Sequence, residues 1–147
     1  MKTVKAVQIL LVEDNPDDVL ITRRALERIR VANDLHVARD GEEAMDFVFR
    51  RGVFGPETPR PDLVLLDINL PRVNGIEVLS HIRANPPTSM IPVIMLTASN
   101  RDEDVATSYR LGANTYIQKP VEFENFLHAL DVVGQYWVVI ATPPPPE

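Results

Sequence analysis

The sequence predicts an α/β protein with one open parallel β-sheet and helices on both faces of that sheet. Five short, largely apolar runs alternate along the chain with five segments of helical character. Unbroken apolar runs of this length are typical of strands that are buried on both faces. Because strand–helix–strand alternation builds right-handed crossovers, we expect all strands to be parallel. The predicted strands are 7–12, 33–38, 63–66, 92–96 and 114–118.

Signals for helix ends stand between these strands and support the same fold. Asn15 can cap a helix through its side chain, and Pro16 occupies the first turn, where its missing N–H does no harm. Asp40 followed by Glu43 is a capping-box pattern, and Gly112 can close a helix in the left-handed conformation. The predicted helices are 15–29, 40–52, 74–84, 100–112 and a last helix that starts near 121.

Length and composition limit the classes of protein that the chain can belong to. Its 147 residues suffice for about one domain, and 45% apolar with 24% charged residues indicates a globular protein. The net charge of −6 argues against a nucleic-acid surface. The chain has no cysteine, no signal-peptide apolar block and no stretch of transmembrane length. We therefore expect a cytoplasmic protein without nucleic-acid or membrane partners.

The connection at residues 52–61 is long for a helix-to-strand loop and is rich in glycine and proline. It contains Val53 and Phe54, an apolar pair that we expect to be exposed. A functional loop and a plain insertion both remain open for this segment.

Polar residues follow four of the predicted strands at the point where each strand ends. They are Glu13 and Asp14 after the first strand, Asp67 after the third, Thr97 after the fourth and Lys119 after the fifth. In a sheet with strand order 2-1-3-4-5 these strands are neighbours, so their ends converge at one crevice. Each residue alone is more often an ordinary strand end or a solvated turn. Their joint occurrence predicts a functional site.

Three clustered carboxylates repel one another, and a divalent cation relieves that repulsion. Mg²⁺ prefers oxygen ligands, retains several waters and is usually held by one or two carboxylates together with phosphate oxygens. We expect Asp14 and Asp67 to be direct ligands and the backbone carbonyl of Asn69 to be a third. Glu13 would bind the ion through a water molecule.

A carboxylate beside Mg²⁺ can attack a phosphoryl group and form an acyl phosphate. Asp67 stands at the carboxyl end of the central strand, where chemistry is usually done in open α/β sheets. Thr97 would donate a hydrogen bond to one phosphoryl oxygen, and Lys119 would neutralise another as a compact positive charge.

Four motifs together resemble the receiver domain of bacterial two-component response regulators. They are L-L-V-E-D-N-P-D-D from Leu10, L-V-L-L-D-I-N-L-P from Leu63, V-I-M-L-T-A from Val93 and Y-I-Q-K-P from Tyr116. The resemblance covers about residues 7–130 and implies a flavodoxin-like (βα)5 fold. It implies that Asp67 accepts a phosphoryl group from the histidine of a sensor kinase. It also implies the roles given above for Mg²⁺, Thr97 and Lys119.

The same resemblance implies a conformational switch. Tyr116 stands at the position of the family's switch aromatic, and the Lys119–Pro120 peptide bond should be cis. On phosphorylation the Thr97 hydroxyl would turn toward the phosphoryl group and Tyr116 would move inward. The surface of the fourth helix, fifth strand and fifth helix would change as a result. The protein would then signal by contact, as a phosphoacceptor and not as an enzyme for separate substrates.

The C-terminal residues predict an interface. Residues 1–130 would complete the receiver domain, and residues 131–147 would extend the last helix into a proline-rich tail without an output domain. Apolar residues of this segment have no core left to cover, which favours a homodimer. The alternative is that the segment folds back over its own sheet. The candidate dimer residues are Phe126, Val133, Tyr136, Trp137 and Ile140.

Two features also resemble the single-domain response regulators that partner bacterial phytochrome histidine kinases. One is the proline-rich 52–61 loop before the third strand. The other is the Tyr136–Trp137 pair followed by a Thr142–Pro143 ending. This resemblance implies light-dependent phosphorylation by a phytochrome-type kinase.

Three alternative functions have different sequence requirements. A Mg²⁺-dependent phosphatase of the haloacid dehalogenase type carries its Asp nucleophile on the first strand, whereas Asp67 lies on the third, and Asn69 stands where a second Asp is needed. A flavodoxin-type FMN carrier needs a phosphate loop where this chain has Glu13 and Asp14. A degenerate receiver acting only as a dimeric scaffold is disfavoured because the acceptor, metal and lysine positions are all intact.

Overall fold

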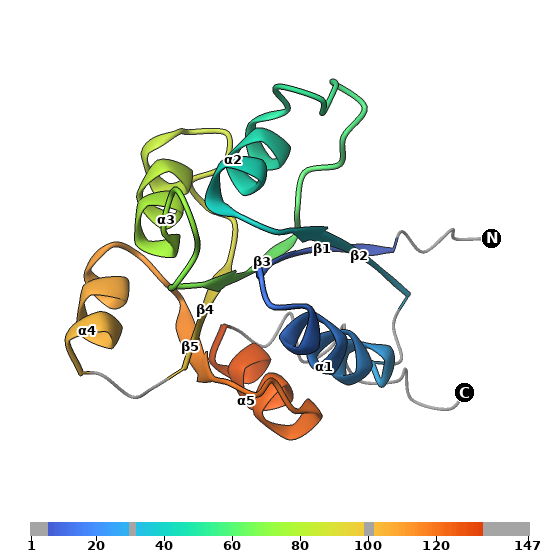
Figure 1. The fold of residues 1–147 in the computed structure, drawn as a ribbon, viewed down its shortest axis with the longest axis vertical. Helices are drawn as coiled ribbons and strands as arrows, with labels where there is room; N and C mark the ends of the chain where they lie inside the picture. The colour runs from blue at the N-terminus through green and yellow to red at the C-terminus, as the bar shows by residue number, and fades with distance from the viewer. Residues whose placement is uncertain (1–5, 30–31, 99–101, 134–147) are drawn as a thin grey trace.

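The computed structural model describes residues 6–29, 32–98 and 102–133. These residues form a five-stranded parallel sheet with strand order β2-β1-β3-β4-β5, flanked by helices (Figure 1). The predicted fold class and strand order are therefore confirmed. In chain order the elements are β1 (Val7–Val12), α1 (Pro16–Glu27), β2 (Asn33–Ala38), α2 (Gly41–Phe49), β3 (Leu63–Asp67), α3 (Gly75–Ala84), β4 (Val93–Thr97), α4 (Asp102–Arg110), β5 (Thr115–Gln118) and α5 (Phe123–Val133).

Two apolar layers cover the two faces of the sheet. The side chains of β3 alternate between them: Val64 and Leu66 pack with α2 and α3, and Leu65 packs with α1 and α5. Figure 1 shows α1 and α5 on one side of the sheet and α2 and α3 on the other. An unbroken apolar run is the pattern that such two-sided burial requires. Within the described ranges, no helix is long and apolar enough to cross a membrane.

The predicted helix caps are present. The Asn15 side chain accepts hydrogen bonds from the backbone N–H groups of Asp17 and Asp18. The Asp40 side chain accepts from the N–H of Glu43, so both helices begin where their caps indicated. Gly112 has φ +100°, as expected for a left-handed turn after α4. The first residues of the predicted 100–112 helix, 100 and 101, lie outside the described residues.

Two strands are longer at their functional ends than the sequence indicated. Asp67 is the last residue of β3 and pairs with Leu96, and Thr97 is the last residue of β4 and pairs with Gln118. Both side chains are therefore held by the sheet itself and not by a following loop. In contrast, α1 ends at Glu27, two residues before the predicted end.

The loop between α2 and β3 is only partly exposed. Val53 is 92% exposed, as expected. Phe54 is half-buried and packs edge-on against Phe47 of α2, with ring centroids 5.2 Å apart. The expectation of an exposed Val53–Phe54 pair is thus wrong for Phe54, because this ring covers the end of the α2–α3 layer. Arg50 closes α2 in the left-handed conformation, and its Nε donates to the Thr58 carbonyl across the loop.

Arg83, near the C-terminal end of α3, joins three segments of the chain. Its guanidinium donates to the backbone carbonyls of Ser89 and Ile91 before β4. It also donates to the carbonyl of Gly112 and the side chain of Asn114 before β5. Burial lowers the pKa of this guanidinium from its ordinary value. Arg83 therefore fixes the starts of β4 and β5 relative to α3.

Helix α5 corrects one predicted interface residue. Phe126 is 0% exposed and belongs to the apolar layer that α5 shares with α1, so its assignment to a dimer surface is wrong. Val133, the last described residue of the helix, is half-buried. The predicted interface residues Tyr136, Trp137 and Ile140 lie outside the described residues.

Candidate phosphoacceptor and metal site

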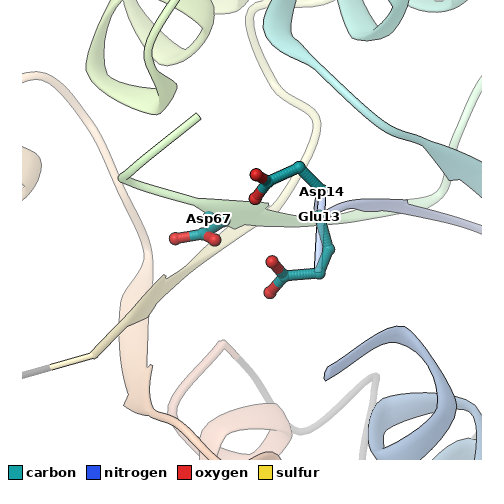
Figure 2. Close-up of side chains that lie close together, drawn as sticks. All are labelled: Glu13, Asp14 and Asp67. Carbon is teal, nitrogen blue, oxygen red and sulfur yellow. The ribbon is translucent and has the colours of Figure 1, made fainter. Parts of the chain in front are cut away.

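The register of the parallel sheet brings three carboxylates together at one edge. Val12 pairs with Leu66, so the residues that follow them, Glu13 and Asp67, emerge side by side. Asp14 follows Glu13 at the same edge. One oxygen from each of the three carboxylates lies within 4.8 Å of the others. Figure 2 shows these side chains directed toward a common space at the ends of β1 and β3.

The three carboxylates differ in their access to solvent. Glu13 is 0% exposed and Asp67 is 2% exposed, whereas Asp14 is exposed at the mouth of the site. Burial, followed by hydrogen bonding to the Asp67 side chain, raises the pKa of Glu13 to about 7. Protonation of Glu13 is favourable because it removes one negative charge from the buried part of the site. A bound cation would likewise offset the negative charge of the carboxylates.

Lys119 is the positive charge of the site. Its Nζ lies 2.9 Å from Glu13 Oε1, 2.9 Å from Asp67 Oδ2 and 3.2 Å from Asp18 Oδ2. Although burial lowers the pKa of this ammonium group, its hydrogen bonds to Asp67 and Glu13 raise it above the ordinary lysine value. Lys119 therefore stays protonated and partly neutralises the cluster.

The backbone around Lys119 is fixed from two directions. Its N–H donates to the carbonyl of Thr97 at 2.7 Å, which holds the end of β5 against the end of β4. The peptide bond between Lys119 and Pro120 is cis, as the family resemblance implied. The Thr97 side chain is 2% exposed at the same strand end. These two residues thus lie beside Asp67 from two neighbouring strands.

The Asp67 carboxylate is also held from its own strand. The N–H of Asn69 donates to Asp67 Oδ1 at 3.1 Å. The N–H of Gly75, the first residue of α3, donates to the carbonyl of Ile68 at 2.9 Å. A Cβ atom at Gly75 would lie 2.1 Å from the Asp67 carbonyl oxygen, so only glycine permits this close approach. The proposed metal-ligand role of the Asn69 carbonyl stays a prediction.

The donor set of the cluster fits a hard divalent cation. Carboxylate oxygens are the ligands that Mg²⁺ prefers, and the ion usually retains waters, which an open side formed by Asp14 allows. The buried oxygens of Glu13 and Asp67 would each gain a favourable partner. Among the described residues, these three carboxylates are the group found close enough together to hold a metal ion.

Tyr116 lies on β5, which pairs with β4, and β4 in turn pairs with the Asp67 strand β3. It is half-buried, and Tyr109 of α4 packs edge-on against it with ring centroids 6.3 Å apart. Both rings line a groove of about 460 Å³ that also includes His128 and Val132 of α5. The predicted switch residue therefore borders a hollow on the surface formed by α4, β5 and α5.

Asp18 is the site residue that sequence reasoning missed. It belongs to the first turn of α1 and reaches Lys119 Nζ at 3.2 Å. The signal was present, because Asp18 follows Asp14 by four positions and lies in the first turn of the helix that Asn15 caps. An acidic first turn is common in helices for dipole reasons alone, and this concealed the contact with Lys119.

Residues 9–131 match the response regulator receiver domain family. The chain belongs to this family. The match begins within β1, ends within α5, and includes every residue of the carboxylate–lysine site.

Known relatives cover nearly the whole chain. The response regulator Rcp1 of Synechocystis sp. is 37% identical over 136 residues, which is 92% of each protein. A solved structure of the bacteriophytochrome response regulator RtBRR is 45% identical, has a TM-score of 0.83, and is matched over 96% of this chain and 86% of that one. The phosphorylated cyanobacterial phytochrome response regulator RcpA is 36% identical, with a TM-score of 0.78 and coverage of 96% and 100%. A structure of Rcp1 represents its Mn²⁺-bound form.

Proposed function

We propose that this receiver accepts a phosphoryl group on Asp67 from the phosphohistidine of a sensor kinase, with Mg²⁺ as cofactor. The observation that carries the proposal is the double placement of Asp67. One of its oxygens belongs to the three-carboxylate cluster, and Oδ2 contacts Lys119 Nζ at 2.9 Å. A nucleophile between a cation site and a fixed ammonium group is the arrangement that phosphoryl transfer requires.

In the proposed reaction, an Asp67 oxygen attacks phosphorus in line with the phosphohistidine nitrogen. A P–O bond forms, the P–N bond breaks, and the imidazole leaves, so Asp67 becomes an acyl phosphate. Mg²⁺ would be held by Asp14, Asp67 and the Asn69 carbonyl, with Glu13 through water, and would stabilise negative charge on the phosphoryl oxygens. Lys119 would move its hydrogen bond from Asp67 to a phosphoryl oxygen.

The proposed switch connects this reaction to the surface. Thr97 would rotate its hydroxyl toward a phosphoryl oxygen, which vacates space at the end of β4. Tyr116 would then move inward from the groove that it forms with Tyr109 and His128. The altered surface of α4, β5 and α5 would bind the next protein in the signalling sequence.

Phytochrome-type kinases are the proposed partners. RtBRR and RcpA are both described as phytochrome response regulators, and each is matched over 96% of this chain. Phosphorylation would then depend on light through the kinase. We further propose a cytoplasmic location, and a homodimer built on the outer side of α5 with Val133 and the residues that follow it. The net charge of −6 supports protein partners in place of nucleic acid.

The proposed acceptor can be tested by intact mass spectrometry after incubation with acetyl phosphate and Mg²⁺. The wild type should gain one phosphoryl group. Asp67→Asn should gain none, because the amide is a poor nucleophile with nearly the same shape. Asp17→Asn is the matched control: it removes the same charge from an exposed position on α1 and should be phosphorylated normally.

Phosphate uptake by Asp67→Asn at the wild-type rate would move the acceptor to another residue. If the wild type gained no phosphoryl group and bound no beryllium fluoride, the chain would be a receiver-shaped scaffold and the proposed function would be wrong.

A further inference from the structure

Lys119 has one more partner than the proposed chemistry needs. Its ammonium group carries three protons, and each has a carboxylate oxygen within hydrogen-bond distance: Glu13 at 2.9 Å, Asp67 at 2.9 Å and Asp18 at 3.2 Å. Glu13 and Asp67 also belong to the cluster that fits a metal ion, whereas Asp18 does not. Asp18 is thus the one partner of Lys119 among these three that a metal ion would leave in place.

Asp18 is well fixed by its own helix. It lies in the first turn of α1, where its N–H donates to the Asn15 side chain at 3.3 Å. Its side chain is 25% exposed, and that of Lys119 is 15% exposed, so the ion pair is largely shielded from water. Asp18 also approaches Lys119 from α1, while the other two carboxylates approach from the ends of β1 and β3.

We propose that Asp18 is a positioning residue for Lys119. Asp18 would hold the Lys119 ammonium group over Asp67 when the metal ion engages Glu13 and the phosphoryl group replaces the contact between Lys119 and Asp67. This inference rests on the proposed function and deepens it. With three protons, the ammonium group can keep Asp18 as a partner while it donates to a phosphoryl oxygen.

Such an anchor has a physical purpose. A lysine side chain has four rotatable bonds and loses considerable rotamer freedom when its ammonium group is held in one place. If its two strand-end partners are taken at the same time, Lys119 would be free to extend into solvent. An anchor on α1 keeps the ammonium group in place before the phosphoryl group arrives, which reduces the entropy lost in the transfer step.

The test compares Asp18→Asn with the matched control Asp17→Asn and the charge-conserving variant Asp18→Glu. Formation of the acyl phosphate is followed by intact mass with acetyl phosphate and Mg²⁺. We expect Asp18→Asn to slow phosphorylation by roughly threefold to fivefold, which is the upper part of the range for loss of one such ion pair. Asp17→Asn should stay within about twofold of wild type, and Asp18→Glu should recover part of the loss.

A second readout does not depend on phosphorylation. Nitrogen-15 NMR of the Lys119 ammonium group reports how fast its protons exchange with water. With Mg²⁺ added, slow exchange should persist in the wild type and Asp17→Asn, and should be lost in Asp18→Asn. Folding of each variant is verified in the same spectra.

Two results would overturn the positioning role. One is that Asp18→Asn matches Asp17→Asn in both readouts. The other is that Asp18→Asn is phosphorylated faster than wild type, since Asp18 would then act only by repelling the incoming phosphoryl group. Failure of the proposed function would look different: the wild type itself would gain no phosphoryl group.

Discussion

Lys119 and Arg83 are two shielded cations of the same fold with different kinds of partners. Arg83 donates to three backbone carbonyls and to the neutral amide of Asn114. Lys119 donates to three carboxylates. Burial lowers the pKa of Arg83, whereas hydrogen bonds to Asp67 and Glu13 outweigh burial and raise the pKa of Lys119.

The difference between neutral and charged partners indicates that Arg83 has a structural role and that Lys119 has a role in the site. The carbonyls that Arg83 binds precede β4 and β5, away from the carboxylate cluster, so these contacts join α3 to the starts of the two strands and take no part in the site. In the proposed function, the carboxylates around Lys119 would exchange this partner for a metal ion, and Asp67 would become phosphorylated. Removal of Arg83 should therefore affect stability, and removal of Lys119 should affect chemistry.

The largest expected effect is that of Lys119→Met on phosphorylation. Loss of a preorganised positive charge at a developing phosphoryl charge should slow acyl phosphate formation by about 100-fold. The variant should also melt at a lower temperature without metal, because Glu13 and Asp67 lose their counter-charge. Mg²⁺ should raise its melting temperature more than that of wild type, since Lys119 no longer competes for the two carboxylates. A normal phosphorylation rate would remove Lys119 from the site chemistry.

Arg83→Met tests the other half of the comparison. It leaves backbone carbonyls before β4 and β5 without donors, and we expect a loss of about 2–3 kcal/mol in the free energy of unfolding, measured in urea. Its phosphorylation rate should match wild type at temperatures where it is folded. Arg72→Met is the control, because Arg72 is 68% exposed with one ion pair to Glu42 and should change stability by less than about 0.5 kcal/mol. Equal effects of the two variants on the free energy of unfolding would contradict the structural role of Arg83 between α3 and the starts of β4 and β5.

The smallest expected effect is a pH dependence of the stabilisation by Mg²⁺, because a proton on Glu13 and the metal ion compete for the same site. In the metal-free protein the pKa of Glu13 is raised to about 7 from its ordinary value of 4.5. The folded state therefore binds this proton more tightly, and the stability from Glu13 is full below pH 4.5 and is lost as pH rises through 7. Because Mg²⁺ competes with the proton, it should raise the melting temperature by a few degrees more at pH 8 than at pH 6.

Calorimetric melting of wild type and Glu13→Gln, with and without Mg²⁺, measures this dependence. The variant has no proton to lose, so its response to Mg²⁺ should be nearly the same at both pH values. A wild-type response independent of pH would mean that Glu13 is already ionised in the metal-free site.

The sequence was sufficient for the sheet and for most of the site. Apolar runs typical of two-sided burial predict the strands, and polar residues at the ends of four strands include Asp67, Thr97 and Lys119. Parallel pairing aligns the ends of neighbouring strands and so brings these side chains together. The capping residues Asn15 and Asp40 were equally predictable, since the cap contacts are local in sequence.

The misses all depend on tertiary packing, which the local sequence pattern does not record. Asp18 meets Lys119 across 101 positions, and no local pattern distinguishes it from any acidic first turn. Phe126 was assigned to a surface although α1 covers it, and Phe54 was expected in solvent although it packs on Phe47. Which apolar side of a short helix or loop faces the core depends on where the neighbouring helices lie.

The close approach of Gly75 to Asp67 gives the site a rigid side and a movable side. The first turn of α3 lies directly against the Asp67 carbonyl, with no side chain between them. A change at Asp67 therefore meets close backbone packing toward α3. Toward β4 and β5 it meets the Thr97 and Lys119 side chains, which can reorient. The phosphorylation signal should accordingly travel in one direction, across β4 to Tyr116, while α3 serves as the stationary frame against which that motion occurs.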